Sequence, residues 1–90
     1  MRRVEKKLFR IADEIRSLQV EEDRLAAELE EHRTRHHDAR LDAVDGHADD
    51  RAYFKDIESD LGRFEKALTK VRNRRASLEE ERVRLLAKLD

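Results

Sequence analysis

Apolar residues recur at alternating spacings of three and four along most of this chain, and this spacing restricts the possible folds more than any other feature. In the first half the seam comprises Val4, Leu8, Ile11, Ile15, Leu18, Leu25 and Leu29. In the second half it comprises Phe54, Ile57, Leu61, Phe64, Leu68, Val71, Leu78, Leu85 and Leu89. Such a repeat places apolar side chains along one side of a helix and is typical of a coiled coil. Because no proline interrupts either run, we expect two long amphipathic helices.

A short segment rich in aspartate separates the two seams. Gly46 is expected to reverse the chain there, because glycine adopts positive φ without steric cost. Asp49 or Asp50 is expected to cap the second helix by accepting from its free N–H groups. The sequence thus predicts one domain over residues 1–90, with helices over 3–44 and 49–89 and a turn over 45–48.

The numbering of the seams predicts how the helices pair. In antiparallel packing, the numbers of two facing residues add to a constant. Leu8 with Leu85 and Ile15 with Leu78 both give 93, whose midpoint falls at the Gly46 turn. The predicted fold class is all-α, an antiparallel two-helix coiled-coil hairpin. Flanking charges are expected to pair across it. The expected pairs are Glu21 with Arg74, Arg33 with Glu58 or Glu65, and Arg35 with Asp60.

One narrow apolar seam gives marginal stability, so self-association of the hairpin is plausible. Two hairpins could form a four-helix bundle. Alternatively, the same seams could pair between two opened chains in a swapped dimer. The spacing of apolar residues does not choose between these forms and a monomer.

The composition excludes several classes of protein. The chain has 90 residues, of which 48% are charged and none is cysteine, so it can form neither disulfides nor a cysteine-ligated zinc site. No apolar run approaches the roughly 18 residues of a membrane span, and the charged start does not resemble a signal peptide. We therefore expect a soluble cytoplasmic protein that binds no membrane. A thin pair of helices has no walls for a substrate pocket, so we expect neither enzyme activity nor a cofactor.

Charge is unevenly distributed along the chain. The net charge is +3 over residues 1–20, −8 over residues 21–60 and +4 over residues 61–90. The candidate site at the turn, the acidic tip, comprises Asp45, Asp49, Asp50, Arg51 and Ala52. Its acidic residues could simply be solvated caps, or they could enter a basic partner or approach a bound metal. Direct nucleic-acid binding is not expected, because phosphates would be repelled and no aromatic stacking platform is present.

Polar residues also occupy the seam. His32 and His36 lie four residues apart, a spacing that can hold a metal on one helix face. Leu61 and Ile57, the residues opposite, cannot supply a further ligand, so we interpret the histidines as filling a thin, half-wet stretch whose packing protonation would loosen. Glu22 and Arg75 are one layer apart and could pair across the seam.

Three apolar residues lie off the seam near the open end of the hairpin. Phe9, Val83 and Leu86 all map to this region. Isolated exposed apolar residues are ordinary, but three in one region could form a docking or dimerising patch.

The start of the second helix, Asp-Asp-Arg-Ala-Tyr-Phe over residues 49–54, resembles the coiled-coil tip of the DksA/TraR family. Asp50, Arg51 and Ala52 fall on the family's Asp-Arg-Ala, whereas its earlier aspartate falls on His47. The Gre factors share the hairpin architecture. The resemblance implies a factor that inserts its tip through the secondary channel of bacterial RNA polymerase, toward the active-site magnesium. The zinc-finger cysteines and the separate globular domain are missing here, so the polymerase would have to be gripped by the open end.

These observations lead to two functional hypotheses. The first is a non-enzymatic coiled-coil interaction module with an acidic tip, which the resemblance would make a regulator of bacterial transcription. The second is a structural or scaffolding coiled coil that acts through homo-oligomerisation or by binding a partner helix.

Overall fold

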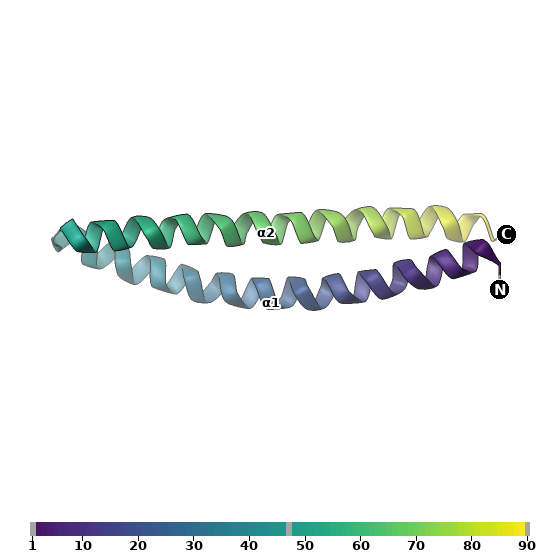
Figure 1. Ribbon diagram of the computed structural model, residues 1–90, viewed down its shortest axis with the longest axis horizontal. Helices are drawn as coiled ribbons and strands as arrows, with labels where there is room; N and C mark the ends of the chain where they lie inside the picture. The colour runs from purple at the N-terminus through teal and green to yellow at the C-terminus, as the bar shows by residue number, and fades with distance from the viewer. Residues whose placement is uncertain (1, 47, 90) are drawn as a thin grey trace. The chain divides into compact units, whose positions relative to one another are not determined.

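The computed structural model describes residues 2–46 and 48–89. They form two helices, α1 (Arg3–Asp45) and α2 (Ala48–Ala87). The helices pack against each other and run in opposite directions, and the described residues contain no strand (Figure 1). The all-α helical hairpin predicted from the 3-4 spacing is therefore confirmed.

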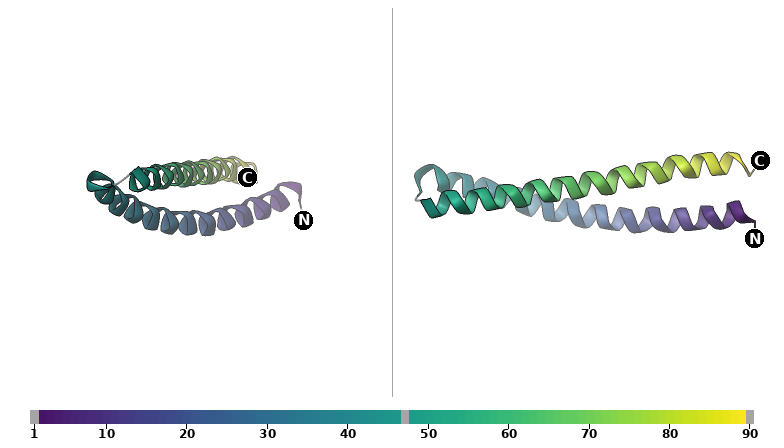
Figure 2. Two further views of the ribbon diagram at one scale, coloured as in Figure 1. Left: turned by 60° about the vertical axis from the view of Figure 1, so that its left-hand side comes forward. Right: turned by 45° about the horizontal axis from the view of Figure 1, so that its top comes forward.

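Contacts along the pair divide the chain into two compact units. The terminal unit is formed by Met1–Asp23 and Thr69–Asp90, and the turn unit by Arg24–Leu68. Each unit contains a stretch of α1 and a stretch of α2, which can be followed by colour in Figure 2.

The core of the terminal unit is a cluster of four buried aliphatic side chains, Ile11, Ile15, Leu78 and Leu85. Val4, Leu8 and Leu18 pack against this cluster and are partly buried. Ile15 and Leu78 are each only 3% exposed, as expected of a pair whose numbers add to 93. Each apolar side chain fully removed from water contributes about 1.5–3 kcal/mol, so this cluster is a main source of the unit's stability.

The polar pair predicted on the seam is also present in the terminal unit. The Arg75 Nε atom donates a hydrogen bond to Glu22 Oε2 at 3.0 Å. Glu79, one turn further along α2, accepts from Arg75 Nη1 at 3.1 Å. The expectation that Glu22 and Arg75 pair across the seam is confirmed.

The turn unit has a different seam, in which aromatic rings replace aliphatic layers. Leu29 and Ala39 of α1 and Ile57 of α2 are buried. His32 stacks on Phe64, with ring centroids 4.3 Å apart, and His36 packs on Phe54 at 5.0 Å. The sequence predicts Leu61 and Ile57 opposite these histidines, whereas the rings that they contact belong to the next seam residues, Phe64 and Phe54.

Each helix extends one residue further into the turn than predicted: α1 ends at Asp45 and α2 begins at Ala48. Because α2 begins at Ala48, Asp49 and Asp50 lie in its first turn. The prediction that one of them is the residue that caps this helix is therefore wrong. Carboxylates in this position favour the helix through its dipole and its free N–H groups.

The reason for glycine at the turn also differs from the prediction. Gly46 does not have positive φ. A β-carbon there would lie 2.5 Å from the Asp42 carbonyl oxygen and 2.7 Å from the Asp50 β-carbon. Residue 46 must therefore be glycine because two neighbours approach its α-carbon closely, and the backbone conformation alone does not demand it.

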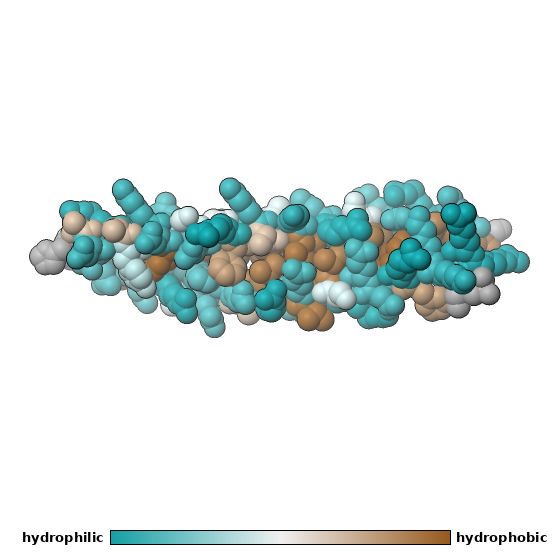
Figure 3. Space-filling view, viewed as in Figure 1, coloured by the Kyte–Doolittle hydropathy of each residue, from teal (hydrophilic) through white to brown (hydrophobic). Residues whose placement is uncertain are grey.

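Polar side chains cover most of the visible surface, and apolar ones appear mainly between the helices (Figure 3). Over the residues that the structure describes, neither helix has a stretch apolar enough to cross a membrane.

Candidate functional site

The terminal unit carries an apolar groove of about 320 Å³ between its two helices. It is lined by Glu5, Leu8, Phe9 and Ala12 of α1 and by Arg82, Leu86 and Leu89 of α2. Three of the apolar side chains stay in contact with water: Phe9 is 62% exposed, Leu86 49% and Leu89 41%. This groove, called the terminal groove below, gathers exposed apolar residues from both helices in one place.

The heptad pattern explains why the groove forms on this side. With the seam at positions a and d, Glu5 and Ala12 of α1 and Leu86 of α2 all occupy e positions. Alanine at residue 12 is too short to cover the neighbouring seam residue Leu8, which stays only partly buried. Phe9, which follows the seam residue Leu8 in the sequence, also lines the groove.

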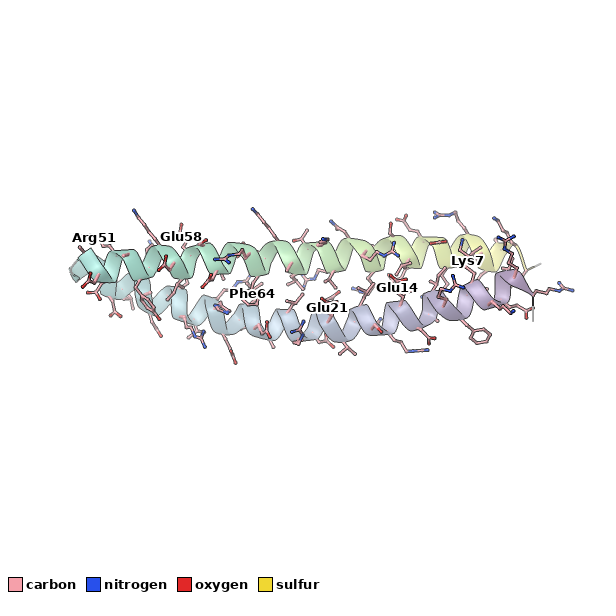
Figure 4. All side chains as sticks on the ribbon, viewed as in Figure 1. Lys7, Glu14, Glu21, Arg51, Glu58 and Phe64 are labelled. Atoms are coloured by element: carbon pink, nitrogen blue, oxygen red, sulfur yellow. The ribbon has the colours of Figure 1, made fainter. Side chains whose placement is uncertain are left out.

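The opposite flank of the same unit is charged and closed by ion pairs. Lys7 Nζ lies 3.1 Å from Glu81 Oε1, and Arg74 Nη2 lies 3.0 Å from Glu14 Oε1. Figure 4 shows Lys7, Glu14 and Glu21 in succession along the side of α1 that borders α2. The two flanks therefore differ in chemistry: one is held by salt bridges between the helices, and the other is open and apolar.

The ion pairs predicted for Glu21, Arg33 and Arg35 are wrong. Asp60, the expected partner of Arg35, pairs with Arg63 of its own helix at 2.8 Å. Arg74 contacts Glu14 and not Glu21, which lies one heptad further along α1. Arg33 pairs along its own helix with Glu30, at 3.6 Å, which leaves Glu58 to His36. For Arg33, a neighbour on the same helix is nearer than a residue across the seam, and exposed pairs gain little from the longer reach.

The structure brings together two of the three residues proposed as a docking patch. Phe9 and Leu86 both line the terminal groove. Val83 lies outside it and is 66% exposed. The sequence did not predict Leu8, Ala12 and Leu89 in this site, because Leu8 and Leu89 are seam residues and Ala12 is small. The signal that could have found them is the short side chain of Ala12 beside Leu8 and the apolar Leu86 near Leu89.

The acidic tip has local structural roles in the turn unit. The Asp50 side chain lies against Gly46, and Arg51 Nη1 donates to the Gly46 carbonyl at 3.5 Å. Arg51 is labelled at the start of α2 in Figure 4. Asp49 and Ala52 are exposed. The side chain of Asp45, like His47, lies outside the described residues, so the acidic tip as a whole stays a prediction.

The seam histidines are engaged by side chains of the opposite helix. His32 stacks on Phe64, and the His36 Nε2 atom lies 3.6 Å from Glu58 Oε2. Within residues 2–46 and 48–89, no group of three His, Asp or Glu side chains is arranged to hold a metal ion. These contacts favour the interpretation that His32 and His36 fill the seam.

Comparison with models of protein families, with curated proteins and with solved structures finds no match for this chain. Its function is therefore inferred below from its residues and their geometry.

A second groove, in the turn unit, is a weaker candidate. It has a volume of about 300 Å³ and is lined by Leu25, Asp60, Arg63, Phe64 and Ala67. Asp60 and Arg63 form an ion pair at 2.8 Å within this lining. Phe64 is already covered by His32. Because its charged residues are paired and its ring is stacked, this groove offers a ligand less free apolar surface than the terminal groove does.

Proposed function

We propose that the chain is a non-enzymatic coiled-coil interaction module that binds another helical protein surface through the terminal groove. The observation that carries the proposal is the groove itself, in which exposed Phe9, Leu86 and Leu89 lie together. Scattered exposed apolar residues need no explanation, but a contiguous apolar patch with polar residues around it is typical of an interaction site.

The spacing of apolar residues in the terminal unit supports a helical partner. A two-stranded coiled coil needs apolar residues only at positions a and d. Helices in a bundle add e or g, so that three positions in seven are apolar. Ala12 and Leu86 at e positions, with Phe9 beside them, extend the apolar face in this way. A further helix is therefore the kind of surface that would cover the groove.

The ion pairs between the helices support a role in binding over a role in catalysis. Lys7 with Glu81, Glu14 with Arg74 and Glu22 with Arg75 each join α1 to α2. Such pairs fix the register and alignment of two helices. They also occupy much of the basic stretch around Arg74 and Arg75, which could otherwise have contacted nucleic acid.

Photo-crosslinking in cells tests this function. A photoreactive phenylalanine analogue placed at Phe9 should capture a defined protein, which mass spectrometry would identify. The same analogue at Val20, which is 71% exposed on the same unit but outside the groove, is the matched control. Leu86→Asp should abolish capture at residue 9. Equal capture from both positions, or capture that survives Leu86→Asp, would contradict the proposal.

A second candidate function is regulation of bacterial RNA polymerase through its secondary channel, in the cytoplasm. Charge favours it: the turn unit holds eight basic and twelve acidic residues, whereas the terminal unit holds thirteen basic and ten acidic ones. In this version Asp49 and Asp50 would act near the channel metal, and the terminal groove would grip the polymerase. Opposed charge at the two units would orient such docking.

Binding to bacterial core RNA polymerase tests the second candidate. The wild-type chain should bind, and Phe9→Asp should weaken that binding. An Asp49→Ala/Asp50→Ala variant should bind but lose its effect in a transcription assay run in parallel. Lack of binding by the wild type at low salt would exclude the polymerase candidate and leave the helical-partner proposal standing.

A further inference from the structure

We infer that the partner in the terminal groove is a second copy of this chain, so that two hairpins form a four-helix bundle at their terminal units. The inference rests on the proposed function, because it names the helical surface that covers the groove. It concerns the terminal unit alone and leaves the turn unit free for other contacts.

The groove has the composition that a two-fold interface requires. In a symmetric dimer the same patch is used by both copies, so the patch must complement itself. Leu8, Phe9 and Ala12 come from α1, and Leu86 and Leu89 come from α2. Because both helices contribute apolar side chains, two copies related by a half-turn can bury both sets against each other.

Two charged residues in the groove lining also fit self-pairing. Glu5 belongs to α1 and Arg82 to α2, and both side chains are half-buried. Among the described residues, neither forms an ion pair. A half-buried charge without a partner is unfavourable. In a two-fold dimer, Glu5 of each copy can meet Arg82 of the other, so one contact between opposite charges is made twice.

The burial of the core supports the same conclusion. No side chain in the described part of the chain is completely buried, and seam residues Val4, Leu8 and Leu18 are only partly covered. Two helices alone cannot enclose these residues. Four helices enclose a shared core, and in the terminal unit the additional helices would lie over the open e flank.

The oligomeric mass of the purified chain tests the inference. Sedimentation equilibrium should give a dimer for the wild type. Phe9→Asp and Leu86→Asp should each raise the dissociation constant on the order of a hundredfold, as expected for a central interface residue. Val20→Asp, the matched control outside the groove, should change it less than threefold. Circular dichroism should show wild-type helicity for all three variants, because each altered side chain is exposed.

A charge exchange separates the two-fold groove from other dimers. Glu5→Arg and Arg82→Glu should each weaken the dimer, and the double variant should recover most of the lost affinity. A wild-type chain that is monomeric at millimolar concentration would overturn the inference. A dimer whose dissociation constant is the same in all the groove variants would also overturn it. That result is expected of a swapped dimer. Capture of a different protein at residue 9 by a monomeric chain would overturn the inference but support the proposed function.

Discussion

Arg75 and Glu22 form a two-pronged ion pair across the seam of the terminal unit. Arg75 Nε lies 3.0 Å from Glu22 Oε2, and Arg75 Nη2 lies 3.3 Å from Glu22 Oε1. Arg72 approaches the same carboxylate at 3.7 Å. Hydrogen bonds from Glu22 and then Glu79 raise the pKa of Arg75 above its already high ordinary value. This contact joins residues 53 positions apart and fixes the register of the two helices.

Removing one member of the pair should destabilise the hairpin. Arg75→Ala leaves the half-buried Glu22 carboxylate without its main partner, so we expect the melting temperature to fall by a few degrees. Glu22→Leu/Arg75→Leu should restore or raise the melting temperature while permitting more than one oligomeric state, because apolar layers do not specify register. Thermal unfolding followed by circular dichroism, with sedimentation for the mass, checks both. A double variant of lower stability than Arg75→Ala would contradict this account.

The contribution of Arg75 should not depend on pH in the ordinary range. A raised pKa means that its stabilisation is complete below the pKa of the unfolded chain and is lost only as the pH rises through the folded value. Both values lie far above neutrality for arginine. The difference in melting temperature between the wild type and Arg75→Ala should therefore stay constant from about pH 7 to about pH 10. A difference that shrinks over this range would show that another group controls the pair.

Truncating a core side chain should lower the free energy of unfolding far more than truncating an exposed side chain. Leu78 is 3% exposed within the terminal cluster, so Leu78→Ala should lower the free energy of unfolding by about 2–4 kcal/mol. Val20 is 71% exposed, so Val20→Ala should change it by less than about 0.5 kcal/mol. Urea denaturation at one protein concentration measures both. Similar losses for the two variants would contradict the assigned core.

The two glycines should respond to alanine in opposite directions. At Gly46 the new methyl group would meet the Asp42 carbonyl, so we expect a loss of about 1 kcal/mol. At Gly62, within α2, a β-carbon would have nothing within 4 Å. Alanine is there the better helix former, and we expect a gain of about 1 kcal/mol. Chemical denaturation of the two variants compares them directly, and stabilisation by Gly46→Ala would disprove the close approach.

The stability of the seam around His32 and His36 should depend on ring stacking and not on a bound metal ion. Phe64→Leu keeps an apolar layer but removes the stack on His32, so stability should fall by about 0.5–1.5 kcal/mol. Addition of Zn²⁺ or Ni²⁺ should leave the wild-type melting temperature unchanged. A metal-dependent rise that His36→Ala abolishes would reverse this interpretation.

Much of the fold follows from spacing alone. The buried apolar residues lie on the 3-4 seam, and the pairing of Glu22 with Arg75 could be predicted because both residues lie on it. The pairing of Arg74 with Glu14 and not with Glu21 could not be predicted, since exposed pairs differ little in energy. The groove was only partly predicted. Phe9 and Leu86 stand out as apolar residues off the seam, whereas exposure of Leu8 and Leu89 depends on how far neighbouring side chains extend.

The position of the turn was predicted from the sequence, but the reason for glycine at residue 46 was not. Glycine is so often chosen for positive φ that the sequence alone suggests this reason at residue 46. The close approach of the Asp42 carbonyl and Asp50 depends on where each helix ends, and helix ends are the least certain feature of a pattern.

The short connection between Asp45 and Ala48 also restricts how this hairpin can move. A slide of one helix past the other by one heptad would be a displacement of about 10 Å. In the turn unit only two residues join the helices, and the first of them has no room for even a β-carbon. Such a slide would require the last turn of α1 or the first turn of α2 to unwind. Without such unwinding, a conformational change in this hairpin must separate the two helices or change the surface that packs on them.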